Sequence, residues 1–445
     1  MFANLIYLFA ILAASPFLLW RAIRRGRYRR GITEKLFGLS AAQAESLLSS
    51  SEHGHDRLWY HAVSVGEVNL LAGLVRQLDS EDPCSFVVST STDTGYDLAV
   101  KHFGREHVFF CPLDFTWAVK RTIKHLQPTK LILVELELWP NLIRSANQQG
   151  CKVLVVNARL SDRSAGRYQK FSFFTRQLFA GLGWVGCQDS EVLSHFEACG
   201  TPPENLEITG SLKFDNAPDR RDTPEVLECE RWLGRNSNHR VWLVGSTQPG
   251  EEAMALAIFR RLILDYPDLR LILVPRHTQR FDEVARLIET YQLIPRRRSL
   301  RTPPSPIWNQ KEVVLIDTIG ELRHWWGTAQ IATVGGSFGS RGGQNMLEPA
   351  GYGVAVSFGP NTRNFKQIAQ TLLSENAACR VSNELELESF VRHCLDDPAY
   401  RQSLGNRAAQ TVNQHRGAVA RTCHAVKQAN AKKKRGSAFV KRHYP

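Results

Sequence analysis

The sequence predicts an α/β fold with two Rossmann-like domains that face each other across a cleft. From Leu58 onward, short apolar runs alternate with helix-sized segments, which is the pattern of strands buried in a parallel sheet. A charged stretch with two prolines at residues 216–240 interrupts this pattern, which then starts again. The chain of 445 residues is also too long for one hydrophobic core. We therefore expect two domains joined by a linker.

The first twenty residues, MFANLIYLFAILAASPFLLW, carry no charged side chain, and RAIRRGRYRR follows them at once. A helix of this length crosses a bilayer, and positive charge after the apolar run disfavours a cleaved signal peptide. We expect a membrane anchor at residues 1–22, with the rest of the chain in the cytoplasm. A helix lying in the membrane interface, or docked on a membrane protein, is the alternative.

The body of the chain divides into predicted domains by its strand pattern. The first domain is expected at residues 41–215, the linker with one short helix at 216–240, and the second domain at 241–428. A basic tail at 429–445 closes the chain. The expected strands lie in LWYHAVSV, FVVST, HVFFCPLD, KLILVELE, KVLVVNARL, WVGCQDS and LEITGSLKF, and then in VWLVGST, LRLILVPR, EVVLIDT, IATVGGSF and VAVSFGP.

The net charge of +13 is confined to the two ends of the chain. Residues 1–40 carry +6 and residues 421–445 carry +8, which leaves the body at −1. This distribution favours an anionic membrane surface as partner and disfavours nucleic acid.

The nine cysteines are scattered and form no C-x-x-C motif. They indicate a reducing compartment and no disulfides or zinc site. No cluster of His, Asp and Glu has metal-ligand spacing, so no metal or cofactor is expected.

Glu67 stands at the junction between a strand, Gly66 and a helical stretch. The positive end of a helix dipole favours an ionised carboxylate there, and such a carboxylate can act as a general base. The alternative is that Glu67 only satisfies the amides of the first helical turn.

Two further acids, Glu135 and Glu137, end a very apolar strand and would share one face of it if the strand were regular. Carboxylates in such a setting need partners or a function. Lys213 and Arg159, at loop exits of the same domain, are candidate partners, or cations for an anionic ligand. A bond to the following helix start is the structural alternative.

Three loops of the second half have phosphate-binding character. A glycine-rich loop, VGGSFGSRGGQNMLEPA, follows a strand, and backbone amides in such loops can approach phosphate. Arg276, His277 and Arg280 follow another strand, and Asp317, Gly320 and Glu321 a third. Together they predict a pocket for an acidic, phosphate-containing donor, although no G-x-G-x-x-G or Walker motif is present.

Nine motifs occur along the chain in the order seen in 3-deoxy-D-manno-octulosonic acid (Kdo) transferases, and the sequence resembles that family over its whole length. They are HAVSVGE (61–67), ELELWPNL (135–142), NARLSDRS (157–164), TGSLKFD (209–215), GSTQPGEE (245–252), PRHTQRF (275–281), DTIGEL (317–322), GGSFGSRGGQNMLEP (335–349) and GPNTRNF (359–365).

The resemblance implies a GT-B glycosyltransferase that moves Kdo from CMP-Kdo to a lipid A precursor, lipid IVA, with inversion, at the inner face of the cytoplasmic membrane. It implies Glu67 as the general base, and Glu135 with Lys213 as the charge-stabilising pair. The implied CMP contacts are Pro275, Arg276, Ile319, Gly320, Glu321, Asn345, Met346, Leu347 and Glu348.

The sequence departs from the family at three positions, where Gln248, Gln344 and Asn361 replace histidines found in many members. Amide side chains donate hydrogen bonds but carry no titrating charge, so donor binding is the step these changes affect. Two other functions stay open: another nucleotide-sugar glycosyltransferase of this architecture, and a membrane-tethered binding or scaffold protein without turnover.

Overall fold

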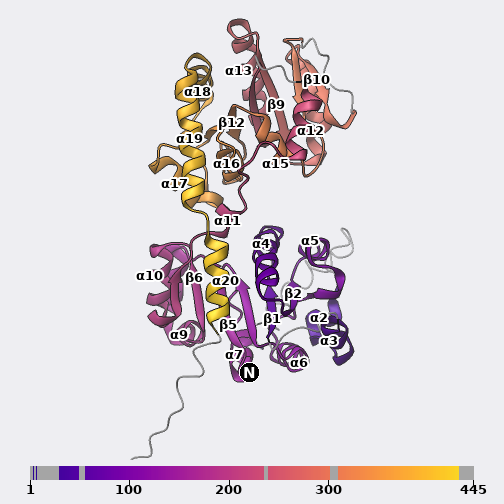
Figure 1. Ribbon diagram of the computed structural model, residues 1–445, viewed down its shortest axis with the longest axis vertical. Coiled ribbons are helices and arrows are strands. Elements are labelled where there is room, and N and C mark those ends of the chain that lie inside the picture. Colours follow the sequence, from indigo (N-terminus) through magenta and orange to yellow (C-terminus); the bar gives the residue numbers. More distant parts are fainter. Residues whose placement is uncertain are drawn as a thin grey trace, which may run out of the picture. The chain divides into compact units, whose positions relative to one another are not determined.

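A computed structural model describes Asn4, Tyr7 and residues 30–49, 56–234, 239–300 and 309–429. The chain forms two compact units, one of residues 1–216 together with 416–445 and one of residues 217–415. Each unit is a parallel-sheet α/β body, which confirms the fold class expected from the strand pattern (Figure 1).

The first unit is built on a seven-stranded sheet in the order β3-β2-β1-β4-β5-β6-β7. All pairs are parallel; Trp59 of β1, for example, pairs with Val87 of β2 and Leu131 of β4. The chain order reverses between β1 and β4, which is where α/β folds place ligands. The strands are β1 (Arg57–His61), β2 (Ser85–Thr90), β3 (Val108–Phe110), β4 (Lys130–Val134), β5 (Lys152–Ala158), β6 (Trp184–Cys187) and β7 (Leu206–Ile208).

Helices cover both faces of this sheet, which explains why its strands are apolar on both sides. Every residue of β4 is buried, and two apolar clusters fill the spaces between sheet and helices. The helices are α2 (Ile32–Phe37), α3 (Ala41–Leu48), α4 (Val65–Glu81), α5 (Asp93–Phe103), α6 (Thr116–Leu126), α7 (Pro140–Gln148), α8 (Asp162–Lys170), α9 (Ser172–Ala180), α10 (Ser190–Cys199), α11 (Leu212–Asp215) and α20 (Ala418–Gln428).

The last helix, α20, belongs to the first unit and not to the second domain, where we had placed it by extending that domain to residue 428. Its residues Cys423 and Val426 are buried in one of the clusters of the first unit. The reason is partly polar: Nζ of the buried Lys130 donates to the carbonyl oxygen of Val426 at 2.9 Å and to Asp56 at 3.1 Å. Sequence periodicity finds the helix but not the body on which it packs.

The second unit has its own seven-stranded parallel sheet, in the order β10-β11-β9-β8-β12-β13-β14. Here the chain order reverses between β8 and β12, the counterpart of β1 and β4. The strands are β8 (Arg240–Thr247), β9 (Leu269–Pro275), β10 (Ile294–Arg297), β11 (Glu312–Leu315), β12 (Ile331–Val334), β13 (Ala355–Phe358) and β14 (Cys379–Arg380).

The helices of the second unit begin inside the stretch that we expected to be a linker, residues 216–240. The stretch contains one helix, as expected. This helix packs against the second unit through the buried side chains Val226 and Trp232. The helices are α12 (Pro224–Leu233), α13 (Glu251–Asp265), α14 (Phe281–Thr290), α15 (Leu322–Trp325), α16 (Leu347–Gly351), α17 (Lys366–Ser374), α18 (Glu384–Asp396) and α19 (Pro398–Gln414).

Within the described residues, no helix has the length and apolar character needed to cross a membrane. The expected anchor at residues 1–22 lies outside the described residues except for Asn4 and Tyr7. The expected basic tail at 429–445 also lies outside them, except for Ala429.

Candidate active site

Glu67 lies in the first turn of α4, directly after β1. Ser64 is the N-cap residue of the helix, and its Oγ accepts a hydrogen bond from the backbone N–H of Glu67 at 3.4 Å. The Glu67 carboxylate in turn accepts from the backbone N–H of Val63 at 2.8 Å and from the Ser64 hydroxyl at 2.6 Å. Glu67 therefore fastens the start of α4, so the structural role that we weighed for it is present.

The Glu67 carboxylate keeps the capacity to take a proton. A carboxylate has about four lone-pair sites, and the two hydrogen bonds use only part of them. Burial raises the pKa of Glu67, and the negative charge of Glu135 raises it further, while the bonds from Ser64 and Val63 oppose the rise. The backbone at Gly66 is uncrowded, since a Cβ built there would meet only Ser64 Oγ, at 3.8 Å.

Glu135 lies just beyond β4, which ends at Val134, and it has a left-handed backbone with φ of 61°. Its N–H donates to the carbonyl oxygen of Val156 at 3.0 Å. Our expectation that Glu135 and Glu137 share one face of a regular strand is therefore wrong, because the strand ends before both. Left-handed backbone is unfavourable for residues other than glycine and is often found at functional sites.

Two cations contact the Glu135 carboxylate. Lys213 Nζ lies 3.4 Å from Oε1, and Arg159 Nη1 lies 3.3 Å from Oε2. Both of the candidate partners suggested by the sequence are thus brought to the same acid. A second left-handed residue, Asn157 with φ of 52°, fixes the start of α11, which carries Lys213: its Oδ1 accepts from Leu212 N at 3.0 Å.

Glu137 completes the group of acids. Its pKa is raised to about 7, first by burial and then by the negative charges of Glu67 and Glu135, against a hydrogen bond from Trp139 Nε1 at 3.1 Å. A carboxyl with this pKa changes its charge near neutral pH. The sequence analysis singled out this acid but assigned it no role.

In the second unit, Glu251 holds the glycine-rich loop that follows β12. Its carboxylate accepts from the backbone N–H groups of Gly336, Ser337 and Phe338, at 2.8, 3.2 and 3.2 Å, and from Gln248 N at 2.9 Å. These three loop amides are therefore engaged by a side chain and not free for phosphate, unlike our expectation for this loop. The sequence analysis assigned no role to Glu251. Its position could have revealed it, because Glu251 follows β8 in the first turn of a helix, as Glu67 does after β1.

Several residues expected to contact the donor lie close together in the second unit. Arg276 is exposed at the end of β9, and its N–H donates to the carbonyl oxygen of Thr247 at 3.1 Å. Burial raises the pKa of Glu348, which the positive charges of Arg323 and Arg276 lower. Asn345 Nδ2 donates to Glu348 Oε1 at 3.1 Å. The loop ends after β9 and before α16 therefore share one charged region.

The remaining expected donor contacts differ in what they can offer. Ile319 is 80% exposed, and Gly320 has φ of 88°, whereas the Glu321 carboxylate already accepts from Arg298 Nε at 3.0 Å and Trp325 Nε1 at 3.1 Å. Three others are buried: Pro275, Met346 and Leu347.

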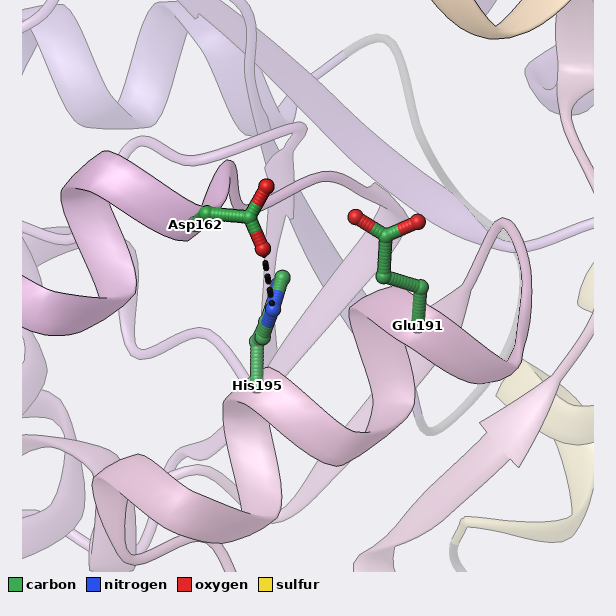
Figure 2. A group of neighbouring side chains, drawn as sticks. All are labelled: Asp162, Glu191 and His195. Carbon is green, nitrogen blue, oxygen red and sulfur yellow. Dashed lines mark ion pairs between the residues drawn. The ribbon is translucent and has the colours of Figure 1, made fainter.

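The described residues contain one group of possible metal ligands, shown in Figure 2. Ligand atoms of Asp162, Glu191 and His195 lie within 4.8 Å of one another, from α8 and α10. His195 Nε2 pairs with Asp162 Oδ1 at 3.1 Å, and its Nδ1 lies 2.8 Å from the carbonyl oxygen of Leu160. Sequence spacing did not reveal this group, because Asp162 comes from a different helix. The group has a structural explanation: Asp162 pairs with His195, and Asp162 and Glu191 lie in the first turns of α8 and α10, where acids are favoured.

Comparison with known proteins decides the family. A family model described as 3-deoxy-D-manno-octulosonic-acid transferase (Kdo transferase) matches residues 27–216. A 3-deoxy-D-manno-octulosonic acid transferase of Haemophilus influenzae is 35% identical over 377 residues, covering 83% of this chain and 86% of its own. The chain belongs to the Kdo transferase family. A transferase of the same name from Bordetella pertussis is 31% identical and covers 95% of this chain and 98% of its own.

Solved structures add the fold of this Kdo transferase family member. A glycosyltransferase of Rickettsia africae aligns with a TM-score of 0.56 and 12% identity, over 85% of this chain and 99% of that one. A UDP-GlcNAc 2-epimerase of Neisseria meningitidis aligns with a TM-score of 0.58 and 10% identity, over 84% and 100%. These similarities show the GT-B fold, and membership of the Kdo transferase family makes the protein a glycosyltransferase. Glu67, Glu135 and Lys213 all fall within the region that the family model matches.

Proposed function

We propose that this Kdo transferase moves Kdo from CMP-Kdo to a lipid A precursor, lipid IVA, with inversion at the anomeric carbon. The observation that carries the proposal is the Glu67 carboxylate, held at the start of α4 by Val63 N and Ser64 Oγ with lone pairs to spare. Membership of the family supports the choice of sugar and donor.

In the proposed reaction, the acceptor hydroxyl oxygen attacks the anomeric carbon of Kdo while the bond from that carbon to the CMP phosphate oxygen breaks. Glu67 accepts the proton of the hydroxyl, and CMP leaves with the electron pair of the broken bond. One displacement of this kind inverts the anomeric centre.

Charged residues of each unit suit the other changes in the reaction. The Glu135 carboxylate, placed between Lys213 and Arg159, favours the positive charge that develops on the sugar carbon. In the second unit, the exposed guanidinium of Arg276 offers positive charge for the departing phosphate. We place the reaction at the cytoplasmic face of the inner membrane, where the basic flank of the apolar N-terminus favours anionic lipid.

The test is transfer of labelled Kdo from CMP-Kdo to detergent-solubilised lipid IVA by the wild-type protein and by Glu67→Gln. General-base removal typically costs about 10²-fold or more, and we expect a loss of that size. Glu81→Gln is the matched control, since it makes the same change at the exposed far end of α4, and it should leave the rate unchanged.

Two results would contradict the proposal. A folded Glu67→Gln variant with nearly full activity would remove Glu67 as the base. CMP binding without transfer to any lipid by the wild-type protein would favour a membrane-tethered binding protein instead. The anomeric configuration of the product, determined by NMR, tests inversion separately.

A further inference from the structure

The α8–α9 segment exposes three phenylalanines on the surface of the first unit. Phe171, Phe173 and Phe174 are 59%, 88% and 69% exposed. The rings of Phe173 and Phe174 stand edge to face, with centroids 5.1 Å apart. A contiguous exposed aromatic group of this kind marks an interaction surface, because isolated apolar residues are common on proteins but clusters are not.

A groove continues this surface. It has a volume of about 470 Å³ and lies between α7 and α9, with Pro140, Ile143, Phe174 and Leu178 among its lining residues. Arg144 lines it as well. Figure 1 shows the two helices at the same end of the first unit. We call the three phenylalanines and this groove the aromatic face.

Basic side chains flank the aromatic face. Lys170 and Arg176 are exposed beside the phenylalanines, and Arg144 lies in the groove. The exposed acids of the neighbouring helices are Asp162 on α8 and Glu191 and Glu197 on α10, which packs against α8 and α9. Aromatic side chains with basic neighbours are typical of surfaces that enter the headgroup region of an anionic bilayer.

The start of the chain is held at the same helix. Asn4 Oδ1 accepts from Asn141 Nδ2 at 3.2 Å, and Asn141 is the second residue of α7. The Tyr7 hydroxyl donates to Asp114 Oδ2 at 3.0 Å, and Asp114 accepts from the backbone N–H groups of Asn141 and Leu142. Asn4 and Tyr7 therefore lie beside the helix that forms one wall of the groove.

We propose that the aromatic face docks on an anionic lipid bilayer, with Phe171, Phe173 and Phe174 in the acyl–headgroup boundary and Lys170, Arg176 and Arg144 against the phosphates. The inference rests on the proposed function, for which it names the surface that meets the lipid. The charge favours a bilayer over a second copy of the chain, because the same face on a partner would repeat the same positive charge.

The experiment measures partition of the full chain onto vesicles that contain no acceptor, made of phosphatidylglycerol and phosphatidylethanolamine or of phosphatidylcholine alone. The test variant is Phe173→Ser with Phe174→Ser. Its matched control is Leu264→Ser with Leu385→Ser, which removes two side chains that are 83% and 75% exposed in the second unit. We expect the aromatic variant to lose about tenfold or more in partition coefficient and the control to lose nothing.

A second variant tests the charges. Lys170→Gln with Arg176→Gln should weaken binding to the anionic vesicles by roughly fivefold for each residue and leave binding to phosphatidylcholine unchanged. All variants should keep the thermal midpoint of the wild-type protein.

Two outcomes would overturn the inference. In the first, the aromatic variant partitions onto vesicles as well as its control does. In the second, the wild-type protein is a dimer in lipid-free solution and the aromatic variant is a monomer, which would assign the face to self-association. If the proposed function is wrong, Kdo transfer is absent but binding to vesicles is unaffected, since partition onto acceptor-free vesicles does not depend on transfer. With acceptor in detergent, the aromatic variant should keep the wild-type rate.

Discussion

Glu67 and Glu251 occupy matching places in the two units. Each lies in the first turn of the helix that follows the first strand of its sheet, beside the point where the strand order reverses. Glu67 accepts from one backbone N–H and one hydroxyl, whereas Glu251 accepts from four backbone N–H groups, three of them about 85 residues further along the chain. The Glu67 carboxylate therefore keeps lone pairs for chemistry, whereas the Glu251 carboxylate has about as many donors as it can accept.

The largest expected effect is on the transfer rate, and it comes from the side chains in the first unit that surround Glu67 and Glu135. Lys213→Met should lower kcat/KM on the order of 10²-fold, because it removes the cation that holds the Glu135 carboxylate in position. Arg159→Gln should cost less, since that side chain is 55% exposed against 24% for Lys213. Steady-state kinetics in detergent check both. Equal losses in kcat/KM would mean that the burial of Lys213 and Arg159 does not determine how much each contributes to the rate.

The next effect is on stability and belongs to the saturated site. Glu251→Gln should lower the free energy of unfolding by about 2 kcal/mol, because an amide cannot accept all four hydrogen bonds and buried donors lose their partner. Glu67→Gln should cost less than about 1 kcal/mol. Urea denaturation of the two variants measures this difference. Equal destabilisation would show that both acids serve mainly to hold loops.

The smallest effect concerns Glu137 and depends on pH. Its pKa is about 7 in the folded protein against a usual value of 4.5, so the folded state binds more protons than the unfolded state between these values. Stability from this group therefore falls as the pH rises from about 4.5 to 7. Glu137→Gln lacks this cost and should melt higher than wild type at pH 8 by at most about 3 °C, with no difference at pH 5. Thermal melts at both pH values decide it.

The sequence predicted the fold class well because strand pattern is a local property. Each of the seven expected runs in the first unit contains a strand, and the five runs of the second contain β8, β9, β11, β12 and β13. The two strands missed are β10, whose sequence IPRR has no apolar run, and β14, which has two residues. Their pairing is set by neighbouring strands, so no local signal exists.

The sequence predicted that Glu135 and Lys213 meet in the first unit, but not most of the bonds around them. The resemblance placed Glu67, Glu135 and Lys213 in one site, and the ion pair of the last two is present in the structure. The backbone bond from Glu135 to Val156 and three of the four donors to Glu251 involve segments distant in sequence. Periodicity cannot show such contacts, which is why the glycine-rich loop was expected to face phosphate.

The position of α20 bears on how the protein is made. Residues 418–428 complete a body whose other parts precede residue 217, and they bring the carbonyl oxygen that receives the buried Lys130. During synthesis on the ribosome, the first unit is therefore incomplete until almost the whole chain has emerged, and until then Lys130 has Asp56 but lacks the carbonyl oxygen of Val426. A message cut short before codon 418 would yield a product whose second body can close while the first cannot.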